Sequence, residues 1–528
     1  MKVCFLKIIF LVGVLVSNTF SSNHYIDKNA TGINDGTSWI NAWESFSAID
    51  WDSVDPGDII YISGGSDSTI YNEQFNVSAS GTAGNPILIT RGIESGHSGK
   101  VIIDGLKTFF NVINITNKQY IVVSNLYLHN SDDSVIKIRR SQHIRIENCA
   151  IHMTARSGIN IMFNESVIVT GCILTTDTLI PHQTDGIYSQ DNINNIYENN
   201  YIIISNRDTG GHDDCIQSYR DASLTIKNNY TEQNNSKTSN AQGIYITASL
   251  GSDTIRVYNN IFNATLSSSN GITFNRATGS TSARVQIVGN TVFGVNLWAQ
   301  YVLKNTFDPI LKNNIGYSIN GNAIVKLADN EFSNPSNIDN NIWKCDDDNP
   351  ISGNDQGESW SSWQAAGFDL HSYLTDPFYN DISSKDFTLK AISDGIDNGQ
   401  SLYPPYNFDY DGNSRPRGSG WDIGAYESVF TASTDNDDRQ PNGYRLFQNY
   451  PNPFNPSTNI SFALPIDSKV RIAVLNLLGE EVAELVNSEF LSGNHTITFD
   501  ATEYTSGVYF YRLKTNEFVE TKKMILIK

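Results

Sequence analysis

The chain has 528 residues, which is long enough for a large core and for more than one domain. Its 36 basic and 56 acidic residues give a formal net charge of −20, which argues against a nucleic-acid backbone as partner. The five cysteines have no zinc-site spacing and are too few for a disulfide scaffold in a chain of this length.

Residues 1–22 have the features of a signal peptide. Lys2 and Lys7 precede an apolar run from Ile8 to Val16, and small polar residues follow where a signal peptidase would cut. The run is too short to span a bilayer, and no later segment approaches the length of a membrane span. We therefore expect a soluble, exported and monomeric mature protein.

A repeat organises the middle of the chain. One motif recurs at steps of 28, 29, 28 and 28 residues as RSGINI (156–161), TDGIYS (184–189), DDCIQS (213–218), AQGIYI (241–246) and SNGITF (269–274). A second motif recurs at steps of 23 to 31 residues and ends at Leu126, Cys149, Cys172, Asn200, Asn229, Asn260, Asn290 and Asn314. Short alternating strands at this period predict a parallel β-helix, with coils stacked about 4.8 Å apart.

Stacking of coils places equivalent residues in columns. The column from Asn200 to Asn314 should form an internal ladder that satisfies the backbone groups of the turns. Cys149 and Cys172 would extend this column, and adjacent coils lie within disulfide reach. We expect buried, reduced thiols there, and a disulfide is the alternative.

The chain from about residue 23 to residue 428 resembles the right-handed parallel β-helix family that contains pectate lyases, alginate lyases and polygalacturonases. The resemblance rests on the repeat and on YIDKNATGINDGTSWINAWESFSAI, PGDIIYISGG, SGTAGNPILITRG and DYDGNSRPRGSGWDIGAYE (409–427). It implies an all-β domain that spans residues 23–428. The acidic runs CDDDNP (345–350) and DYDG (409–412) are interpreted as solvated loops or structural turns of the Ca²⁺-binding type.

A separate domain is predicted at the C-terminus. Residues 429–443 are polar and without periodicity, as in a linker, and residues 444–528 contain alternating strands that predict a small β-sandwich. This tail resembles the type A sorting domain of the type IX secretion system, carried by exported proteins of Bacteroidetes-like bacteria. The resemblance rests on QNYPNPFNPST (448–458), NLLGEEV (476–482), SGVYFYRL (506–513) and the basic residues Lys522, Lys523 and Lys528.

That resemblance implies the type IX secretion machinery as a partner, passage through the outer membrane, and release or attachment at the cell surface. A carbohydrate-binding sandwich is the alternative interpretation of the tail.

Two polar columns on the predicted coils suggest a substrate groove. The repeat position is the one held by Gly158, Gly186, Cys215, Gly243 and Gly271. One column precedes it and contains Ser157, Asp185, Asp214, Gln242 and Asn270, and the other lies two residues after it and contains Asn160, Tyr188, Gln217, Tyr245 and Thr273. Amides, acids and aromatic rings suit sugar hydroxyls and sugar faces. We therefore expect a polysaccharide as the partner, contacted by His182, Tyr188, Gln217, Arg220, Gln242, Tyr245 and Arg276.

Two of these coils resemble motifs of polygalacturonases. QTDGI (183–187) is similar to the Asn-Thr-Asp-Gly motif of that family, and HDDCI (212–216) is similar to its Asp-Asp-Cys motif. By this resemblance Asp185, Asp213 and Asp214 are catalytic acids of an inverting hydrolase, with His212 beside them. Repulsion between Asp185 and Asp214 would raise one pKa.

The resemblance does not extend to the next two coils. Gln242 stands where that family has histidine, and Thr273 and Asn275 stand where it has arginine and lysine. A lyase is therefore also open, with Ca²⁺ bound by the three aspartates as charge neutraliser. The candidate bases for a lyase are His182, His212, Arg220, Lys227, Tyr245 and Arg276.

The sequence assigns no cofactor and no set of metal ligands, and Ca²⁺ is expected only in the lyase alternative. Asp and His before Gly or Cys are also ordinary turn residues. Strict alternation would point Asp214 inward with Ile216, so Asp213 is predicted to be the outward residue. The two functions in view are a secreted polysaccharide-active enzyme, hydrolase or lyase, and a non-catalytic glycan-binding or adhesive surface protein.

Overall fold

The structure is a computed structural model. It describes residues 21–176, 184–205, 213–234, 241–247, 254–264, 270–275, 284–294, 301–304, 306, 308–318, 325–328, 334–345, 350–352, 359–429, 444–447, 449, 452–477 and 479–527. Almost all of the predicted signal peptide and most of the predicted linker lie outside these residues. No helix in the described ranges is long and apolar enough to cross a membrane.

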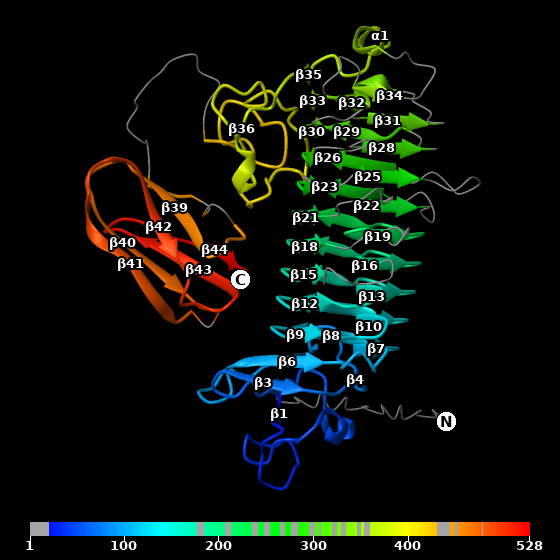
Figure 1. Cartoon of the computed structure of the whole chain (residues 1–528), viewed down its shortest axis with the longest axis vertical. Helices are drawn as coiled ribbons and strands as arrows, with labels where there is room; N and C mark the ends of the chain where they lie inside the picture. Colours follow the sequence, from blue (N-terminus) through cyan, green and yellow to red (C-terminus); the bar gives the residue numbers. More distant parts are fainter. Residues whose placement is uncertain are drawn as a thin grey trace, which may run out of the picture.

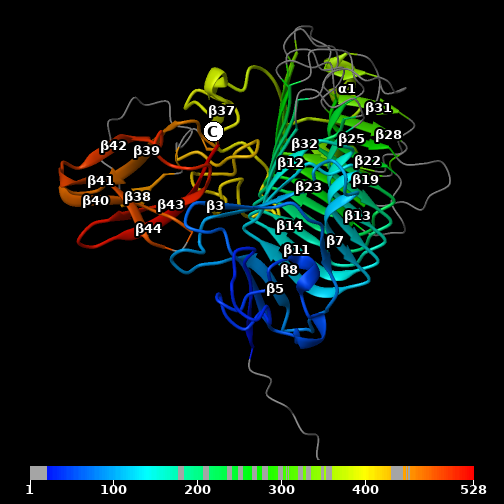
Figure 2. The ribbon, with the colours of Figure 1, turned by 60° about the horizontal axis from the view of Figure 1, so that its bottom comes forward.

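Three long parallel sheets form a column of coils, each coil contributing one strand to each sheet (Figures 1 and 2). Sheet A contains β1 (Asn23–Ile26), β2 (Ile59–Ile62), β5 (Ile87–Arg91), β8 (Gln119–Ser124), β11 (Gln142–Glu147), β14 (Ile168–Thr170), β17 (Ile196–Glu198), β20 (Thr225–Lys227), β23 (Thr254–Tyr258), β26 (Arg284–Val288), β29 (Ile310–Lys312) and β32 (Ile338–Asp339).

Sheet B contains β3 (Ser68–Tyr71), β6 (Lys100–Asp104), β9 (Tyr127–His129), β12 (Ala150–Met153), β15 (Ile173–Thr176), β18 (Tyr201–Ile204), β21 (Tyr230–Gln233), β24 (Ile261–Ala264), β27 (Thr291–Gly294), β30 (Ile315–Ser318), β33 (Ile342–Lys344) and β35 (Tyr373–Leu374). Sheet C contains β4 (Phe75–Val77), β7 (Asn111–Thr116), β10 (Ser134–Arg139), β13 (Ser157–Met162), β16 (Asp185–Gln190), β19 (Ile216–Tyr219), β22 (Gln242–Thr247), β25 (Asn270–Asn275), β28 (Tyr301–Lys304), β31 (Val325–Ala328) and β34 (Ile351–Ser352). Helical segments are short: η1 (Phe46–Ala48), η2 (Trp51–Ser53), η3 (Pro335–Asn337), η4 (Ile382–Ser384) and α1 (Trp360–Ala365).

The predicted fold class is confirmed: the chain is an all-β parallel β-helix, with the right-handed connections that parallel strands favour. The register is also as predicted, because the repeat motifs fall on successive strands of sheet C and pair residue for residue. Their inward column is buried and consists of Ile113, Ile136, Ile159, Ile187, Ile216, Ile244 and Ile272.

The predicted asparagine ladder is confirmed at the turn from sheet A to sheet B. Each ladder residue accepts, on its side-chain Oδ1, the backbone N–H of the equivalent residue one coil earlier, over N···O distances of 2.9–3.0 Å. The ladder residues are Asn200, Asn229, Asn260, Asn290, Asn314 and Asn341. The residue before each has a left-handed backbone, with φ between 53° and 62°, and is Asn or Gly, the types that adopt it most easily.

The thiols of Cys149 and Cys172 continue this column. Both are buried and free, so the prediction of reduced thiols is confirmed. The Cys172 N–H donates to Asn200 Oδ1, and the Cys172 thiol donates to the Ile146 carbonyl. Burial raises the pKa of the Cys172 thiol, which keeps it protonated.

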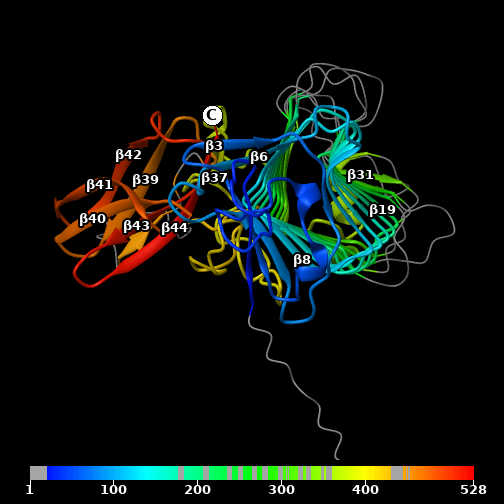
Figure 3. The ribbon, with the colours of Figure 1, turned by 90° about the horizontal axis from the view of Figure 1, so that it is seen from below.

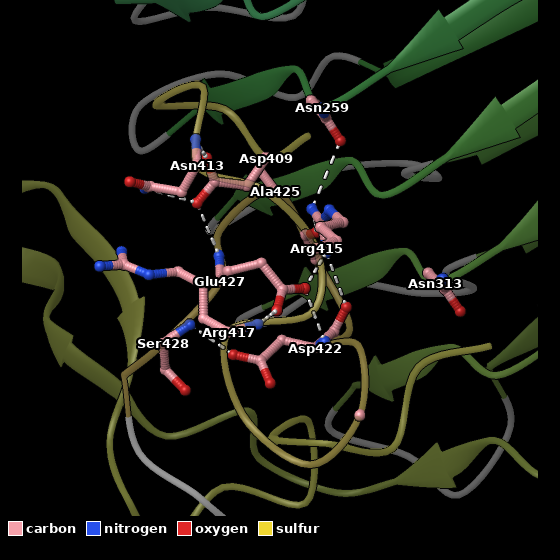
Figure 4. Close-up of polar contacts among 12 residues, drawn as sticks. Asn259, Asn313, Asp409, Asn413, Arg415, Arg417, Asp422, Ala425, Glu427 and Ser428 are labelled. Atoms are coloured by element: carbon pink, nitrogen blue, oxygen red, sulfur yellow. Dashed lines mark hydrogen bonds and ion pairs between the residues drawn. The ribbon is translucent and has the colours of Figure 1, made fainter. Parts of the chain in front are cut away.

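Residues 375–429 cover the outer face of sheet B from β18 to β33, and they include the short strands β36 (Tyr379–Asp381) and β37 (Asp386–Leu389). Figure 4 shows an ion pair inside this segment, whose Arg415 also donates to Asn259 of the β-helix at 3.4 Å. Arg415 donates to Glu427 at 2.7 Å and to the Gly424 carbonyl at 2.8 Å, and both side chains of the pair are almost fully buried. The DYDG run is therefore a structural turn: buried Asp409 accepts the backbone N–H groups of Asn413 and Glu427. Of the other acidic run, residues 346–349 lie outside the described part of the chain.

The C-terminal domain is the predicted β-sandwich. One sheet contains β38 (Arg445–Leu446), β39 (Ser457–Leu464) and β42 (Gly493–Asp500), and the other contains β40 (Ser468–Leu475), β41 (Glu481–Phe490), β43 (Gly507–Lys514) and β44 (Val519–Leu526). An apolar core lies between the two sheets. The domain lies beside the β-helix on the side of sheet B, and the Tyr127 hydroxyl donates to the Ser506 carbonyl at 3.0 Å (Figure 1).

Candidate functional site

The outer face of sheet C carries the second polar column. Seen along the coils, this sheet lies on the side away from the C-terminal domain (Figure 3). Asn160, Tyr188, Gln217 and Tyr245 are half-buried on this face, as outward residues of a strand should be, whereas Thr273 is buried. The face therefore presents amides and phenol rings in a row along the coils.

The three predicted aspartates come together where the strands of sheet C begin. Asp185 Oδ1 accepts the backbone N–H of Asp214 at 3.1 Å. Asp214 Oδ1 accepts the backbone N–H of Gln242 at 2.9 Å, and Asp213 Oδ1 accepts that of Thr184 at 2.8 Å. Carboxylates from two adjacent coils thus form one cluster, and each of them also satisfies a backbone donor of a neighbouring coil.

All three aspartates are buried, with exposed fractions of 5% for Asp185, 1% for Asp213 and 0% for Asp214. The expectation that Asp213 points outward is therefore wrong. Its carboxylate turns to the amide of Thr184, an interaction between coils that alternation within one strand does not contain. The first polar column is likewise buried at Ser157 and Gln242, and Asn270 alone among its members is half-buried.

The strict alternation of inward and outward side chains breaks in a bend just before the Ile column. A Cβ at Gly186 would lie 2.6 Å from the Ile202 side chain, and one at Gly243 would lie 2.5 Å from the Phe262 ring. The repeat position therefore faces the interior together with the Ile that follows it. Glycine, or the small thiol of Cys215, fits between sheets B and C at this corner.

Burial and negative charge act together on Asp214. Its pKa is well above the usual range, first because of burial and then because of the neighbouring Asp185 carboxylate. Its second oxygen, Oδ2, is buried and has no hydrogen-bond partner in the structure. The predicted repulsion between Asp185 and Asp214 thus acts in the expected direction, although burial is the larger cause.

The other predicted contact residues divide by location. Tyr188 has a pKa above its usual value, because of burial and the nearby Asp185 carboxylate, and its hydroxyl donates to Gln190. Arg220 lies in the turn from sheet C to sheet A and binds Asp191 at 2.5 Å. Lys227 lies on sheet A, where it pairs with Glu198 at 2.9 Å, so it cannot be the base of this site. His182, Gln183, His212 and Arg276 lie outside the described residues.

The three aspartates do not present a calcium site. Each gives one carboxylate oxygen to a backbone N–H, whereas Ca²⁺ needs six to eight oxygen ligands. Within the described ranges, no group of three or more His, Cys, Asp or Glu residues is arranged to hold a metal ion.

Sequence reasoning missed one further buried acid, Asp221. It ends a second ladder at the turn from sheet C to sheet A, which runs from Ser141 through Asn164 and Asn192. Burial raises the pKa of Asp221 to about 6, and hydroxyls of Ser189 and Ser218 donate to its Oδ2. The spacing of Asn164, Asn192 and Asp221 at 28 and 29 residues could have revealed this ladder.

Comparison with known proteins identifies the tail. Residues 448–528 match the family described as the secretion system C-terminal sorting domain. The chain thus ends in a sorting domain of the type IX system and is exported to the cell surface or the extracellular space. No curated protein matches the chain.

Several solved structures resemble the chain at low sequence identity. A GH136 lacto-N-biosidase from Eubacterium ramulus is 11% identical over 67% of this chain and 67% of its own, with a TM-score of 0.40. A mannuronic acid specific polysaccharide family 6 lyase from human gut microbiota is 11% identical over 62% of this chain and 87% of its own, with a TM-score of 0.30. Pectate lyase C from Erwinia chrysanthemi is 11% identical over 75% of this chain and 89% of its own, with a TM-score of 0.22.

Proposed function

We propose that the mature protein acts on a polysaccharide that lies along the outer face of sheet C, with Asp185, Asp213 and Asp214 as the reactive groups. One observation carries this proposal. Carboxylates of two adjacent coils meet at the start of strands whose outward residues, Tyr188 and Gln217, suit a glycan. A polymer along this face would cross the strands and meet one such side chain every 4.8 Å or so.

The electrostatics support acid–base chemistry. An inverting glycosidase needs one protonated carboxyl as acid and one carboxylate as base. The raised pKa of Asp214 favours its protonated form over those of ordinary carboxyl groups, so it is the proposed acid, and Asp185 or Asp213 is the proposed base. Tyr188, which also stays protonated, would donate a hydrogen bond to a sugar oxygen.

A lyase, unlike a hydrolase, needs a base that removes the proton next to a uronate carboxylate. Of the candidate bases, Tyr245 is half-buried on the face of sheet C and Arg220 is held by Asp191 at its edge. Tyr245 is the better placed of these two. His182 and His212 belong to the same proposal from the sequence alone.

A non-catalytic glycan-binding protein is the second candidate, and a specific observation favours it. All three aspartates are buried, and each accepts a backbone N–H from another coil. Buried carboxylates with such bonds can serve the stack of coils alone. In that case the outer face of sheet C would bind a glycan without cleaving it.

Asp→Asn variants separate the two candidates. Asn keeps the Oδ1 acceptor that Thr184 and Gln242 use, but it cannot exchange a proton. Asp213→Asn and Asp214→Asn are compared with wild type on acidic and neutral polysaccharides, and Asp132→Asn, at an exposed aspartate, is the matched control. Reducing ends measure hydrolysis, and the ultraviolet absorbance of unsaturated uronates measures elimination.

For an enzyme we expect turnover to fall about 100-fold or more in Asp213→Asn or Asp214→Asn, with an unchanged circular dichroism spectrum and wild-type rates in the control. Full activity in both variants would refute the assignment of the aspartates. Binding without turnover on the whole panel would establish the second candidate.

A further inference from the structure

The coil that contains β10 carries three cations on the side where the glycan is proposed to lie. Lys137 and Arg139 are the outward residues of β10, and Arg140 follows in the turn and is exposed. In the sequence they form the alternating run VIKIRR, with Ile136 and Ile138 buried between them. In a chain of net charge −20, such a group of cations on one face is unexpected.

Among the described residues, these cations have no acidic partner within ion-pair distance. Their neighbours across the sheet are uncharged: Lys137 pairs with Asn114 and Asn160, and Arg139 pairs with Thr116 and Met162. Within the described residues, no carboxylate lies within 4.0 Å of the charged nitrogens of Lys137, Arg139 or Arg140. The buried Nε of Arg139 also has no hydrogen-bond acceptor.

An exposed aromatic ring lies beside the cations. Phe163, on the next coil, is 41% exposed, and the Arg139 guanidinium lies 5.7 Å from its ring centroid. Phe163 has a left-handed backbone, with φ of 61°, at a turn position that Asn117, Arg140, Asp191 and Arg220 occupy on other coils. An exposed Phe in that conformation is uncommon, because a bulky side chain disfavours it.

Arg140 and Phe163 line a groove of about 500 Å³ at the edge between sheets C and A. Of the acids in this groove, Asp191 is paired with Arg220 at 2.5 Å, whereas Glu165 only accepts from the neutral amide of Gln142 at 3.3 Å and keeps its charge. Beside it, Lys137, Arg139 and Arg140 supply three positive charges without an ion-pair partner among the described residues. A flat apolar ring next to guanidinium groups matches a sugar ring with an anionic substituent.

We infer that Lys137, Arg139, Arg140 and Phe163 form a subsite for an anionic sugar residue of the polysaccharide, with the ring of the sugar on Phe163. This inference rests on the proposed function and adds the substrate class to it. The cationic coil lies two coils, about 10 Å, before the coil of Asp185 along the stack. Lys137 stands in the same outward column as Asn160 and Tyr188, so a polymer that follows this column would also meet the cationic coil. The anionic group is a uronate carboxylate or a sulfate ester.

Binding of defined polymers tests the subsite with the full mature chain. Affinities for sodium alginate, polygalacturonate, dextran sulfate and neutral dextran are measured by affinity electrophoresis at low and high NaCl. The test variant is the triple Lys137→Gln/Arg139→Gln/Arg140→Gln. The matched control is Lys390→Gln/Lys469→Gln/Lys514→Gln, which changes the net charge equally at three exposed lysines elsewhere.

We expect the test variant to lose about tenfold or more in affinity for the anionic polymers and to lose most of the salt dependence of binding. Phe163→Ala should lose about threefold or more at either salt concentration. Carboxylated polymers bound in preference to dextran sulfate would identify a uronate, and the reverse would identify a sulfate ester.

Wild-type affinity in the test variant, an equal loss in the control, or no binding of any anionic polymer would overturn the subsite. The proposed function would survive that result if a neutral polysaccharide is cleaved and Asp214→Asn stops the cleavage. Conversely, if anionic polymers bind through these four residues but are never cleaved, the subsite is supported and the proposed enzymatic activity is refuted.

Discussion

Replacement of Asn260 by alanine tests how much the asparagine ladder stabilises the coils. Asn260 is 1% exposed, and its Oδ1 accepts the Asn229 backbone N–H at 3.0 Å. Its Nδ2 donates to the carbonyls of Ile226 and Tyr258, at 2.9 Å and 3.1 Å, and to Asn290 Oδ1 at 3.0 Å. Alanine therefore leaves the buried N–H of Asn229 without its acceptor, and it removes a donor from two buried carbonyls.

A buried donor without a partner costs about 1–3 kcal/mol, so Asn260→Ala should destabilise its coil by about 2–4 kcal/mol in all. Hydrogen exchange of the Asn229 amide is the direct assay, because it reports local opening. We expect exchange to be about 30-fold to several hundredfold faster, since 1.4 kcal/mol corresponds to a factor of ten.

Asn114→Ala is the control for that experiment, since its side chain bonds Asn76 and Thr116 on the outer face of sheet C. Substitutions at such positions change stability by about 0.5 kcal/mol or less. The ladder does not stabilise the coils if Asn260→Ala accelerates amide exchange at Asn229 no more than Asn114→Ala accelerates amide exchange at the residues next to Asn114.

Three further predictions concern charge and thiols. Burial raises the pKa of Asp221 to about 6, so between about pH 4 and pH 6 the folded chain holds a proton there that the unfolded chain has lost. The melting temperature should therefore fall as the pH rises from about 4 to about 6. Asp221→Asn should flatten that fall in thermal scans. Arg415→Met should cost about 3–5 kcal/mol, because it leaves the buried Glu427 carboxylate unpaired, and a loss below about 1 kcal/mol in urea unfolding would show that the pair does not stabilise the folded segment. Cys149 and Cys172 should react with an alkylating reagent, without reductant, only after unfolding, and mass spectrometry that finds them blocked would contradict the free thiols.

The pairing of the coils could be predicted from sequence because each coil repeats the same pattern. Ile187 and Ile216 pair as the aligned motifs require, and the Asn200–Asn229 bond follows from the spacing of the second motif. Local repetition of this kind fixes the register, because a slip of one residue would expose every apolar side chain.

The direction of the aspartate side chains could not be predicted in the same way. Asp213 turns to an amide 29 residues away, on the previous coil, and the bend at the repeat position depends on the room that Ile202 leaves beside Gly186. Both effects arise between coils, where a pattern within one strand carries no information. The cations of VIKIRR were visible in the sequence, but their lack of acidic partners follows only from the packing of neighbouring coils.

The asparagine ladder has a direction, because the acceptor for each turn always belongs to the coil that comes later in the chain. The last coil is closed by Ser372, which accepts the Asn341 backbone N–H at 2.8 Å, and by Asp369, which accepts the Asn341 side chain at 3.0 Å. If the coils form in order from the N-terminus, each newest turn keeps unsatisfied buried amides until the next coil packs on it. The stack is then complete only when residues 369–372 close the turn of Asn341.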